Sequence, residues 1–466
     1  MNTAEHVHFI GIGGYGMSAI ARVMLEMGYT VTGSDVASQE LTEKLAAKGV
    51  RIYIGHQADH VEGADLVVYS TALSKDNVER KAAEERNIPI IHRAQMLARL
   101  MNAGKGIAVA GAHGKTTTSS MIALVMETCR LDPTYIIGGE IVNVGTNAKA
   151  GKGEYVVAEA DESDGSFLQY HPTLAIVTNI EADHLENYDS DFGKLKAAYV
   201  QFLGQVKEGG HAILCADDEN IRELLPDLRM QGSLSGDEGI MTYGIDHDAD
   251  FKAEEIVLGD RKVSFNVTKQ GQLLGRIELS VPGQHNVYNA LATVITCLKA
   301  GIPFADVAEA IREFRGAKRR FQVLGETNDI LVIDDYAHHP TEIQATISAA
   351  KATGKRIIAV FQPQRYTRTF FLLEQFSRAF GEADEVIITD IYSPAGEQQI
   401  EGVSSSKLVE MIKSNSNPNA AYIPTKEEVQ VHLARHVRPG DLVITMGAGD
   451  IWKAADHLAK WLRSQH

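Results

Sequence analysis

Residues 109–120 read Val-Ala-Gly-Ala-His-Gly-Lys-Thr-Thr-Thr-Ser-Ser and overlap an apolar run, Ile107–Ala110. This order predicts a strand, a glycine loop and a helix that begins near Gly114. Backbone N–H groups in such a loop converge on one point, and the helix N-terminus adds partial positive charge there. Lys115 can reach terminal phosphate oxygens, and the Thr116 hydroxyl can hold Mg²⁺. The stretch therefore predicts a nucleoside triphosphate site.

The loop departs from the usual phosphate-binding spacing at one position. Val109 stands where the first glycine is expected, and Gly111 is the nearest glycine. A bare Gly-Lys-Thr is common by chance, but the strand before it and the helix after it favour the functional interpretation. The residues assigned to the nucleotide in this segment are Gly111, His113, Gly114, Lys115, Thr116 and Thr117.

Bulk composition limits the class of protein. The chain has 466 residues, which is typical of about three domains, and 44% of them are hydrophobic. Its formal net charge of −16 argues against nucleic acid or an anionic membrane surface as a partner. The three cysteines lack metal-ligand spacing, which indicates reduced thiols. With no signal-peptide pattern and no membrane-length apolar run, we expect a cytoplasmic protein.

Strand-like runs alternate with helical stretches along the whole chain, which predicts an α/β protein with mostly parallel sheets. Two joints divide it, at residues 101–106 and 313–321. We predict a Rossmann-like N-terminal domain, a P-loop-type ATP-binding central domain and a Rossmann-like C-terminal domain. Their predicted bounds are 1–103, 104–315 and 316–466.

The first domain carries a second glycine loop. Gly-Ile-Gly-Gly-Tyr-Gly at 11–16 follows the predicted strand Val7–Ile10, and Asp35 lies about 20 positions further on. This spacing is typical of a dinucleotide site, but it does not distinguish NAD from another diphosphate. The later strands, expected at Asp65–Tyr69 and Ile88–Ile91, end in polar residues whose alternative role is helix capping. The candidate substrate-binding residues here are Gly13, Gly14, Gly16, Asp35, Ser70, His92 and Arg93.

Acidic residues follow two predicted strands of the central domain. Glu159 directly follows Tyr155–Ala158, and we interpret it as a Mg²⁺ ligand beside the phosphate loop. His184 closes the acidic stretch after Thr173–Thr178, and we interpret it as a second ligand. Asn286 and Asn289, in a helix that begins within residues 282–292, contact a base or ribose or else cap that helix.

The third domain has four strong strand predictions, and unusual residues follow them. Asp-Asp-Tyr-Ala-His-His-Pro at 334–340 follows Ile330–Ile333, and Arg365 and Arg368 follow Arg356–Phe361. The paired histidines suggest metal, but Pro340 starts a helix at once and no third ligand is evident, so we favour substrate contact. The arginines suit carboxylate or phosphate recognition, and their alternative is a solvated basic loop. The other two strands are expected at residues 385–389 and 442–446.

Three segments taken together resemble the Mur ligase family: residues 11–16, Ala-His-Gly-Lys-Thr-Thr-Thr at 112–118, and Asp-Asp-Tyr-Ala-His-His-Pro-Thr at 334–341. The resemblance covers nearly the whole chain. Four shorter motifs add to it: Asn179-Ile-Glu-Ala-Asp-His184, Gly283-Gln-His-Asn286, Lys318-Arg-Arg-Phe321 and Gly447-Ala-Gly-Asp450.

The resemblance implies ATP-dependent ligation of L-alanine to the carboxylate of UDP-N-acetylmuramate through an acyl phosphate. This is a step of bacterial peptidoglycan precursor synthesis. The first domain would then bind UDP instead of NAD, the second ATP and Mg²⁺, and the third would close over both. The implied protein is a monomer or weak homodimer in the cytoplasm, without nucleic acid or membrane partners.

The resemblance also implies roles for single residues. It places Lys115 on the ATP phosphates and Thr116, Glu159 and His184 on Mg²⁺. The remaining implied roles are Asn286 and Asn289 near adenine; Arg320 and Asp335 at ATP or the metal; and Tyr336, His338 and Arg365 toward the substrate acid and alanine. Arg368 is a candidate substrate-binding residue from its side-chain chemistry. The expected catalytic residues are Lys115, Glu159, His184, His338 and Arg365, with His338 as the conceivable base for the amine.

Two departures from the family pattern stand out. Several sister ligases hold a second Mg²⁺ with a carbamylated lysine, and Tyr199 takes that position here, with Lys194 and Lys196 out of register. Gln364 stands where a histidine is expected before Arg365. Three alternatives stay open: an NAD-dependent dehydrogenase, a nucleotide-dependent switch or transport ATPase, and the recycling ligase of the same family that attaches a peptide.

Overall fold

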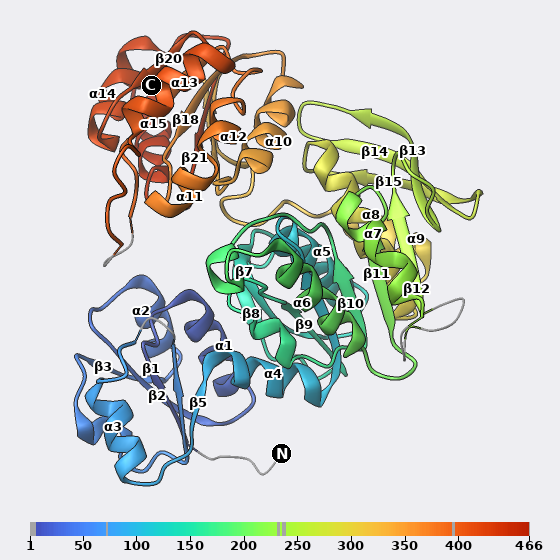
Figure 1. Ribbon diagram of the computed structural model, residues 1–466, viewed down its shortest axis with the longest axis vertical. Coiled ribbons are helices and arrows are strands. Elements are labelled where there is room, and N and C mark those ends of the chain that lie inside the picture. Colours follow the sequence, from blue (N-terminus) through green and yellow to red (C-terminus); the bar gives the residue numbers. More distant parts are fainter. Residues whose placement is uncertain (1–5, 71–72, 231–233, 235–238, 394–396, 466) are drawn as a thin grey trace. The chain divides into compact units, whose positions relative to one another are not determined.

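The computed structural model describes residues 6–70, 73–230, 234, 239–393 and 397–465. They form two compact units. Figure 1 labels many of their helices and strands. Unit 1 comprises Met1–Glu254, Asn266–Ile277 and Tyr288–Glu313. Unit 2 comprises Glu255–Phe265, Glu278–Val287 and Phe314–His466. Among the described residues, no helix is both long and apolar enough to span a membrane.

The first sheet, in unit 1, has five parallel strands in the order β3-β2-β1-β4-β5. Its strands are β1 (His6–Ile10), β2 (Thr30–Asp35), β3 (Arg51–Ile54), β4 (Leu66–Tyr69) and β5 (Ile90–His92). Its helices are α1 (Tyr15–Glu26), α2 (Glu40–Ala46), the 3-10 helix η1 (Ala58–Val61), α3 (Val78–Glu85) and α4 (Arg93–Ala103). Strand β1 is the most buried, and one buried position in it is polar, because His8 is 0% exposed.

The second sheet has ten strands in the order β15-β14-β13-β12-β11-β10-β6-β9-β7-β8. Its first strands are β6 (Lys105–Ala110), β7 (Thr134–Ile141), β8 (Thr146–Lys149), β9 (Tyr155–Glu159) and β10 (Leu174–Val177). The others are β11 (His211–Cys215), β12 (Ile240–Gly244), β13 (Phe251–Leu258), β14 (Val263–Lys269) and β15 (Gln272–Leu279). Strand β6 pairs in parallel with β9 on one side and β10 on the other. The residues that follow these three strands therefore meet at one edge of the sheet.

The helices of this part are α5 (Lys115–Thr128), α6 (Phe192–Gly204), α7 (Glu219–Leu228), α8 (Gln284–Lys299) and α9 (Phe304–Arg312). Two 3-10 helices, η2 (Ser166–Gln169) and η3 (Leu185–Tyr188), lie in the loops after β9 and β10. Helix α5 is buried over most of its length, from Thr118 to Met126. The phosphate loop therefore leads into a helix that is fixed within the core.

The third sheet, in unit 2, has the order β16-β17-β21-β18-β19-β20, and only β16 runs antiparallel to its neighbour. The strands are β16 (Gln322–Thr327), β17 (Ile330–Asp335), β18 (Arg356–Phe361), β19 (Glu385–Ile388), β20 (Ala420–Tyr422) and β21 (Asp441–Met446). The helices are α10 (Pro340–Lys351), α11 (Tyr366–Phe371), α12 (Leu373–Ser377), α13 (Ser405–Asn415), α14 (Lys426–His436) and α15 (Trp452–Ser464). Alternate strand residues feed two apolar cores, one on each face, because successive side chains point to opposite sides.

The predicted α/β class with three sheet-containing domains is confirmed. Several strands run further than predicted. The sequence places five acidic or histidine side chains just beyond their strands, whereas the structure includes them at the strand ends: Asp35, His92, Glu159, Asp334 and Asp335. Parallel pairing extends to these positions, for example Asp335 opposite Met446. The antiparallel pair β7–β8 is the clearest exception to parallel order in the second sheet. The bounds of the three domains stay a prediction.

Candidate functional site

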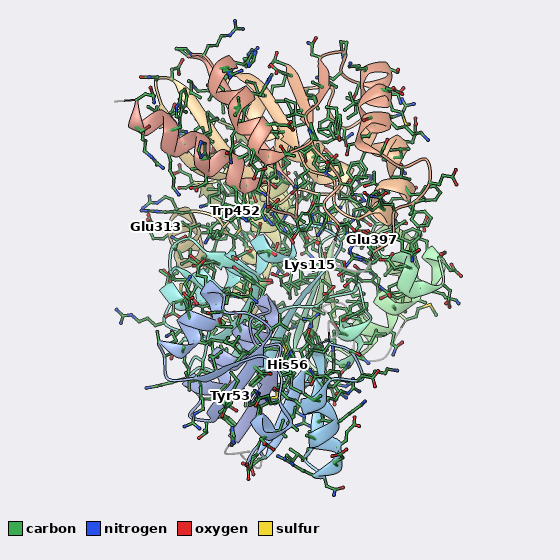
Figure 2. All side chains as sticks on the ribbon, turned by 90° about the vertical axis from the view of Figure 1, so that its left-hand side faces the viewer. Tyr53, His56, Lys115, Glu313, Glu397 and Trp452 are labelled. Carbon is green, nitrogen blue, oxygen red and sulfur yellow. The ribbon has the colours of Figure 1, made fainter. Side chains whose placement is uncertain are left out.

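The phosphate loop requires its glycines for steric reasons (Figure 2, where Lys115 is labelled). Gly111 has φ +128° and Gly114 has φ +86°, both in the region that favours glycine. A Cβ on Gly111 would lie 2.1 Å from the Thr178 hydroxyl oxygen, and one on Gly114 would lie 2.6 Å from Asn289 Oδ1. The backbone at both glycines therefore lies so close to Thr178 and Asn289 that a side chain at either position would collide with them.

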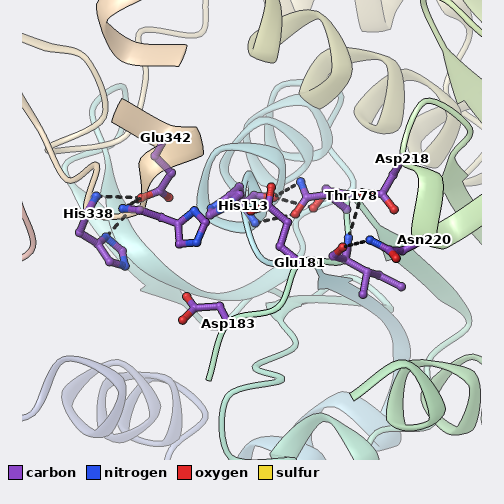
Figure 3. A network of polar contacts seen from close by, with 12 residues as sticks. His113, Thr178, Glu181, Asp183, Asp218, Asn220, His338 and Glu342 are labelled. Carbon is purple, nitrogen blue, oxygen red and sulfur yellow. Dashed lines mark hydrogen bonds and ion pairs between the residues drawn. The ribbon is translucent and has the colours of Figure 1, made fainter. Parts of the chain in front are cut away.

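Residues that follow β10 hold this loop in place (Figure 3). The His113 N–H donates to Asn179 Oδ1 at 2.8 Å, and Asn179 Nδ2 donates back to the His113 carbonyl at 3.1 Å. The Thr178 hydroxyl donates to the same carbonyl at 2.5 Å. The His113 ring lies 3.2 Å from a Glu181 carboxylate oxygen. The predicted nucleotide residue His113 is therefore fixed to the strand beside the loop.

Lys115 makes a buried ion pair that sequence reasoning missed. Its Nζ donates to both carboxylate oxygens of Glu162 at 2.9 Å and also to the Gly111 carbonyl. Burial lowers the pKa of Lys115, but the charges of Glu162 and Asp161 outweigh burial and raise it. Burial raises the pKa of Glu162 more than Lys115 lowers it. Lys115, the predicted phosphate-binding residue, is thus paired with a carboxyl group whose pKa is raised.

The segment of Glu162 is tied to the loop that carries His184. The Tyr188 hydroxyl donates to the Glu162 carbonyl, and Asn187 Nδ2 donates to the Ser163 carbonyl at 2.6 Å. Tyr188 and Asn187 belong to η3, the 3-10 helix that directly follows His184. The loops after β9 and β10 therefore act as one hydrogen-bonded layer.

The three predicted metal ligands all lie at the same edge of the second sheet. Thr116 is in the first turn of α5, and Glu159 ends β9, where its Oε1 accepts the Gly138 N–H at 2.7 Å. His184 has φ +55°, with its ring 3.5 Å from Asp183 and 3.8 Å from Glu186. The loop before it is held from α7, because the Ile180 N–H donates to Asp218 at 3.2 Å. Hydroxyl and carboxylate oxygens suit Mg²⁺, whereas an imidazole nitrogen suits it less well.

The two asparagines of the α8 segment make structural contacts. Asn289 accepts a hydrogen bond from the Thr118 hydroxyl at 3.2 Å and is 5% exposed. Asn286 donates to the Pro282 carbonyl at 2.6 Å and is also buried. The first contact joins α8 to α5 beside the phosphate loop, whereas the second stays at the start of α8.

Asp35 supports the first glycine loop directly. Its Oδ2 accepts the Gly13 N–H at 2.8 Å, and a Cβ on Gly13 would lie 2.7 Å from Gln39 Nε2. Gly14 precedes α1 as its N-cap residue, and a Cβ on Gly16 would lie 3.2 Å from an Arg93 nitrogen. The structure thus groups these glycines with Asp35 and Arg93 at the end of the sheet.

The polar residues after β4 and β5 divide between capping and charge. His92 caps α4 by accepting the Ala94 N–H at 3.3 Å, and burial, with Arg93 adding to it, lowers the pKa of His92. Arg93 lies 3.8 Å from Asp164. Ser70 follows β4, and its neighbour Thr71 lies outside the described residues. The capping alternative therefore describes His92 in this structure.

In unit 2, Asp335 sits at the buried end of β17. Its two carboxylate oxygens accept the N–H groups of Ala337 and Phe321, each at 2.7 Å. Burial raises the pKa of Asp335 to about 6, although Arg320 opposes this shift. Arg320 itself lies 3.5 Å from Glu342. Asp335 therefore changes its charge just below neutral pH.

Tyr336 lies between two guanidinium groups. Arg319 is 5.0 Å and Arg320 is 5.3 Å from the centre of its ring. Sequence reasoning missed Arg319, which donates to Asp334 at 2.9 Å and to the Gly447 carbonyl at 2.6 Å. The Gly447-containing motif thus supports the Tyr336 loop through Arg319.

His338 lies next to Glu342 and contacts it (Figure 3). Its Nδ1 lies 2.9 Å from the Tyr336 carbonyl, so Nδ1 carries the proton and Nε2 the lone pair. The backbone N–H of His338 donates to Glu342 Oε2 at 2.9 Å. Burial lowers the pKa of His338 to about 4, although Glu342 raises it. At neutral pH His338 is a hydrogen-bond acceptor of low basicity.

The arginines after β18 lie at the start of α11. Arg365 has φ +67° and precedes the helix, and Arg368 Nη1 donates to Gln364 Oε1 at 3.2 Å. Glu397, labelled in Figure 2, was not predicted; it accepts the N–H groups of Tyr366 and Thr367. The unusual Gln364 thus orients one of the two predicted cations.

Tyr199 lies within the buried face of α6. It is 1% exposed, and its ring packs edge-on against Phe167 with centroids 5.4 Å apart. The neighbouring lysines point elsewhere, since Lys194 pairs with Asp189 at 2.6 Å and Lys196 with Glu223 at 2.7 Å. The described structure therefore presents a packed phenol at this position.

Comparisons with known proteins agree along the whole chain. Three family models match: the Mur ligase family catalytic domain at residues 6–105, the Mur ligase middle domain at 109–297, and the Mur ligase glutamate ligase domain at 319–449. Together they cover most of the sequence.

Two curated relatives and one solved structure are similar over nearly full length. The UDP-N-acetylmuramate–L-alanine ligase of Symbiobacterium thermophilum is 48% identical, covering 100% of this chain and 96% of its own. The enzyme of the same name from Pelotomaculum thermopropionicum is 50% identical and covers 99% of each chain. The UDP-N-acetylmuramate–alanine ligase structure from Thermotoga maritima has 30% identity and a TM-score of 0.81, covering 99% of each chain.

Proposed function

The chain belongs to the Mur ligase family, and from this premise we propose that it joins L-alanine to the carboxylate of UDP-N-acetylmuramate with ATP. Relatives at 48 and 50% identity carry that activity in their names. The enzyme is an ATP-dependent amide-bond-forming ligase of peptidoglycan precursor synthesis. The observation that carries the proposal is the glycine loop with Lys115 at the edge between β9 and β10.

The chemistry follows from the poor reactivity of a carboxylate. Transfer of the γ-phosphoryl group of ATP to the substrate carboxylate gives an acyl phosphate and ADP. The alanine amine attacks the acyl carbon, and phosphate leaves. Both steps depend on neutralising charge and aligning the reactants more than on covalent help from the protein.

On the nucleotide side, the Lys115 side chain and the N–H groups of the first turn of α5, from Lys115 to Thr117, neutralise the phosphates. Lys115 leaves Glu162 to do so, and the raised pKa of Glu162 lets that carboxyl take up a proton when its partner moves. The contact of Asn289 with Thr118 fixes the adenine side of the loop. These roles rest on the short contacts around the loop.

Mg²⁺ fits the oxygen ligands at this edge. Thr116 and Glu159 would hold it directly, and His184 would act through a bound water, because magnesium prefers oxygen and retains waters. When bound, Mg²⁺ supplies positive charge to the phosphate oxygens. The Gly138 N–H keeps the Glu159 carboxylate oriented.

On the acceptor side, the first glycine loop with Asp35, Ser70, His92 and Arg93 binds the UDP-sugar. In unit 2, Arg365, Arg368 and Tyr336 are assigned to the carboxylates of the substrate acid and of alanine. Arg320 and Asp335 are assigned to ATP or the metal. His338 was a candidate base for the amine, but a group with a pKa of about 4 removes an ammonium proton poorly. We expect His338 to orient the amine instead.

The rivals from other classes each explain only one part of the chain. A dehydrogenase accounts for the first glycine loop but leaves Lys115, Glu159 and His184 without a role. A switch or transport ATPase accounts for the phosphate loop but not for the first sheet. The recycling ligase of the same family differs in attaching a peptide, so it is distinguished by the amine it accepts.

The test is phosphate release from ATP and Mg²⁺, with UDP-N-acetylmuramate and a panel of amino acids and peptides added singly and together. We expect release only when the UDP-sugar and L-alanine are both present. Release that ignores UDP-sugars, or a preference for a tripeptide over alanine, would overturn the proposal.

We further propose a cytoplasmic monomer or weak homodimer with the domain bounds given above. All three cysteines lie among the described residues and are free thiols, which is typical of a reducing compartment. Sedimentation of the purified protein over a range of concentrations tests the oligomeric state.

A further inference from the structure

Helix α3, which belongs to the part of unit 1 that contains the first sheet, carries a buried carboxylate, Glu79. The Glu79 side chain is 0% exposed, and histidine and hydroxyl side chains are linked to it by hydrogen bonds and ion pairs. We call Glu79 together with these side chains the histidine cluster. Its members are His6, His8, Thr32, Ser34, His56, His60 and Glu79 (Figure 2 labels His56 and the adjacent Tyr53).

Glu79 is saturated with hydrogen-bond donors. Oε1 accepts from His60 Nδ1 at 2.6 Å and from the Gln57 N–H at 3.1 Å. Oε2 accepts from the Ser34 hydroxyl at 2.5 Å and from His8 Nε2 at 3.3 Å. Burial alone raises its pKa, but the contacts of His8, Ser34 and His60 lower it to about 2. Glu79 is therefore a permanent anion inside the domain.

A line of hydrogen bonds leads from Glu79 toward the surface. The Thr32 hydroxyl lies 2.8 Å from His8 Nδ1 and 2.8 Å from His6 Nε2. His6 Nδ1 lies 2.8 Å from the Gly63 carbonyl. Four hydrogen bonds connect the Gly63 carbonyl to the Glu79 carboxylate. Both of these end groups are hydrogen-bond acceptors.

Burial lowers the pKa of His8, although its contact with Glu79 opposes this shift. At the other end of the line, the backbone N–H of His6 donates to Asp65 at 2.9 Å. The line therefore ties Glu79 to β1 through His8 and Thr32.

The same carboxylate is linked to the first glycine loop through Ser34. The Ser34 hydroxyl donates to Glu79, while its carbonyl accepts the Gly11 N–H at 2.8 Å and the Ile12 N–H at 3.0 Å. The next residue, Asp35, accepts the Gly13 N–H at 2.8 Å. Three successive loop N–H groups therefore donate to the last two residues of β2. Glu79 holds the first of these two residues, Ser34, through its hydroxyl group.

We propose that Glu79 is a positioning residue for the UDP-sugar, acting through Ser34 and Asp35 on the glycine loop. The inference rests on the proposed function, because it concerns the substrate assigned to that loop. Glu79 touches no substrate itself. Its carboxylate holds the Ser34 side chain, and the Ser34 carbonyl in turn orients the first loop amides.

The test compares Glu79→Gln with Glu84→Gln, a substitution on the same helix at a carboxylate that is 56% exposed. The glutamine keeps the shape but turns an NH₂ group toward donors. We expect the KM for UDP-N-acetylmuramate to rise about tenfold, with kcat and the KM for ATP within about twofold of wild type. Glu84→Gln leaves all three unchanged. An unchanged KM in Glu79→Gln, or an equal loss in every parameter, overturns the proposal.

Ser34→Ala keeps the test decisive if Glu79→Gln does not fold. It removes only the hydroxyl link, and we expect the KM for the UDP-sugar to rise about threefold. Calorimetry of UDP binding, without ATP or alanine, separates the two levels of argument. If wild type does not bind UDP, the proposed function fails; if wild type and Ser34→Ala bind equally, only the positioning role fails.

Discussion

Glu162 and Glu79 are both buried glutamates of unit 1, yet their pKa values shift in opposite directions. Glu162 has one cationic partner, Lys115, and burial prevails, so its pKa is raised. Glu79 has donors on both oxygens, and its pKa falls to about 2. The carboxylate with one charged partner is the one whose pKa is raised.

The difference corresponds to two uses of a buried carboxylate. In the proposed function Lys115 leaves Glu162 for the phosphates of ATP, and a raised pKa of Glu162 lowers the free energy needed for that separation. Glu79 lies under a loop that must stay in place, and its many short contacts make it a fixed point. The following predictions break or sharpen this contrast, from the largest effect to the smallest.

Lys115→Ala tests the mobile side of the contrast. We expect kcat/KM to fall by about 10³ or more, since a preorganised cation at the transferred phosphate is lost. Thermal stability should change little, because Glu162 can take up a proton. Phosphate release and a melting curve measure the two effects. Lys105→Ala, at an exposed lysine paired with Glu154, is the matched control, and a similar loss there would contradict the assignment.

Glu79→Gln tests the fixed side through stability. Replacing a saturated buried carboxylate leaves several donors poorly paired, and we expect the unfolding free energy to fall by about 2–4 kcal/mol. Urea unfolding provides the measurement, with Glu84→Gln expected within about 0.5 kcal/mol of wild type. Equal midpoints for the two variants would show that the histidine cluster does not depend on this charge.

Acid titration sharpens the same point. The pKa of Glu79 falls from 4.5 to about 2 on folding, so its contribution is complete above pH 4.5 and is lost as pH falls toward 2. The loss amounts to about 2 kcal/mol by pH 3. The stability difference between wild type and Glu79→Gln should therefore shrink in urea titrations from pH 6 to pH 3, and a constant difference would refute it.

Asp335 is another buried carboxylate, and burial raises its pKa. It tests whether this shift makes the activity of the enzyme depend on pH. Its pKa is raised to about 6, so the group is protonated below that pH and ionised above it. We expect kcat/KM for ATP to fall about tenfold between pH 7 and pH 5. Asp335→Asn should flatten this limb of the pH profile, and a profile identical to that of wild type would exclude Asp335 as its source.

Glu162→Gln should have the smallest effect. Removing a competitor for Lys115 and a negative charge near the phosphates favours nucleotide binding, and we expect ADP to bind about three- to fivefold more tightly. Calorimetric titration with ADP and Mg²⁺ measures this change. Weaker binding would mean that Glu162 holds Lys115 in position instead of competing with the phosphates.

The sequence predicted the parts of the site that local patterns encode. The glycine loop, Lys115 and the strand-end position of Glu159 follow from a strand, a turn and a helix in immediate succession. The end of β10, with Asn179, was recognised as polar, but its hold on the His113 backbone depends on the pairing of β6 with β10.

Residues that act across long separations were not predictable in the same way. Glu162 pairs with Lys115 over 47 residues, and the only signal was the acidic run from Asp161 to Asp164. Glu79 and His8 are 71 residues apart. Their signal was two histidines at alternate positions of an otherwise apolar strand, which places both on one face of the sheet.

The packing of Tyr199 against Phe167 bears on whether the enzyme needs dissolved carbon dioxide. A lysine amine at that position would have to capture dissolved carbon dioxide before it could bind metal, whereas a phenol buried against a ring does not. Turnover should therefore be the same in degassed buffer and in buffer with bicarbonate, and the activity should not depend on the concentration of carbon dioxide.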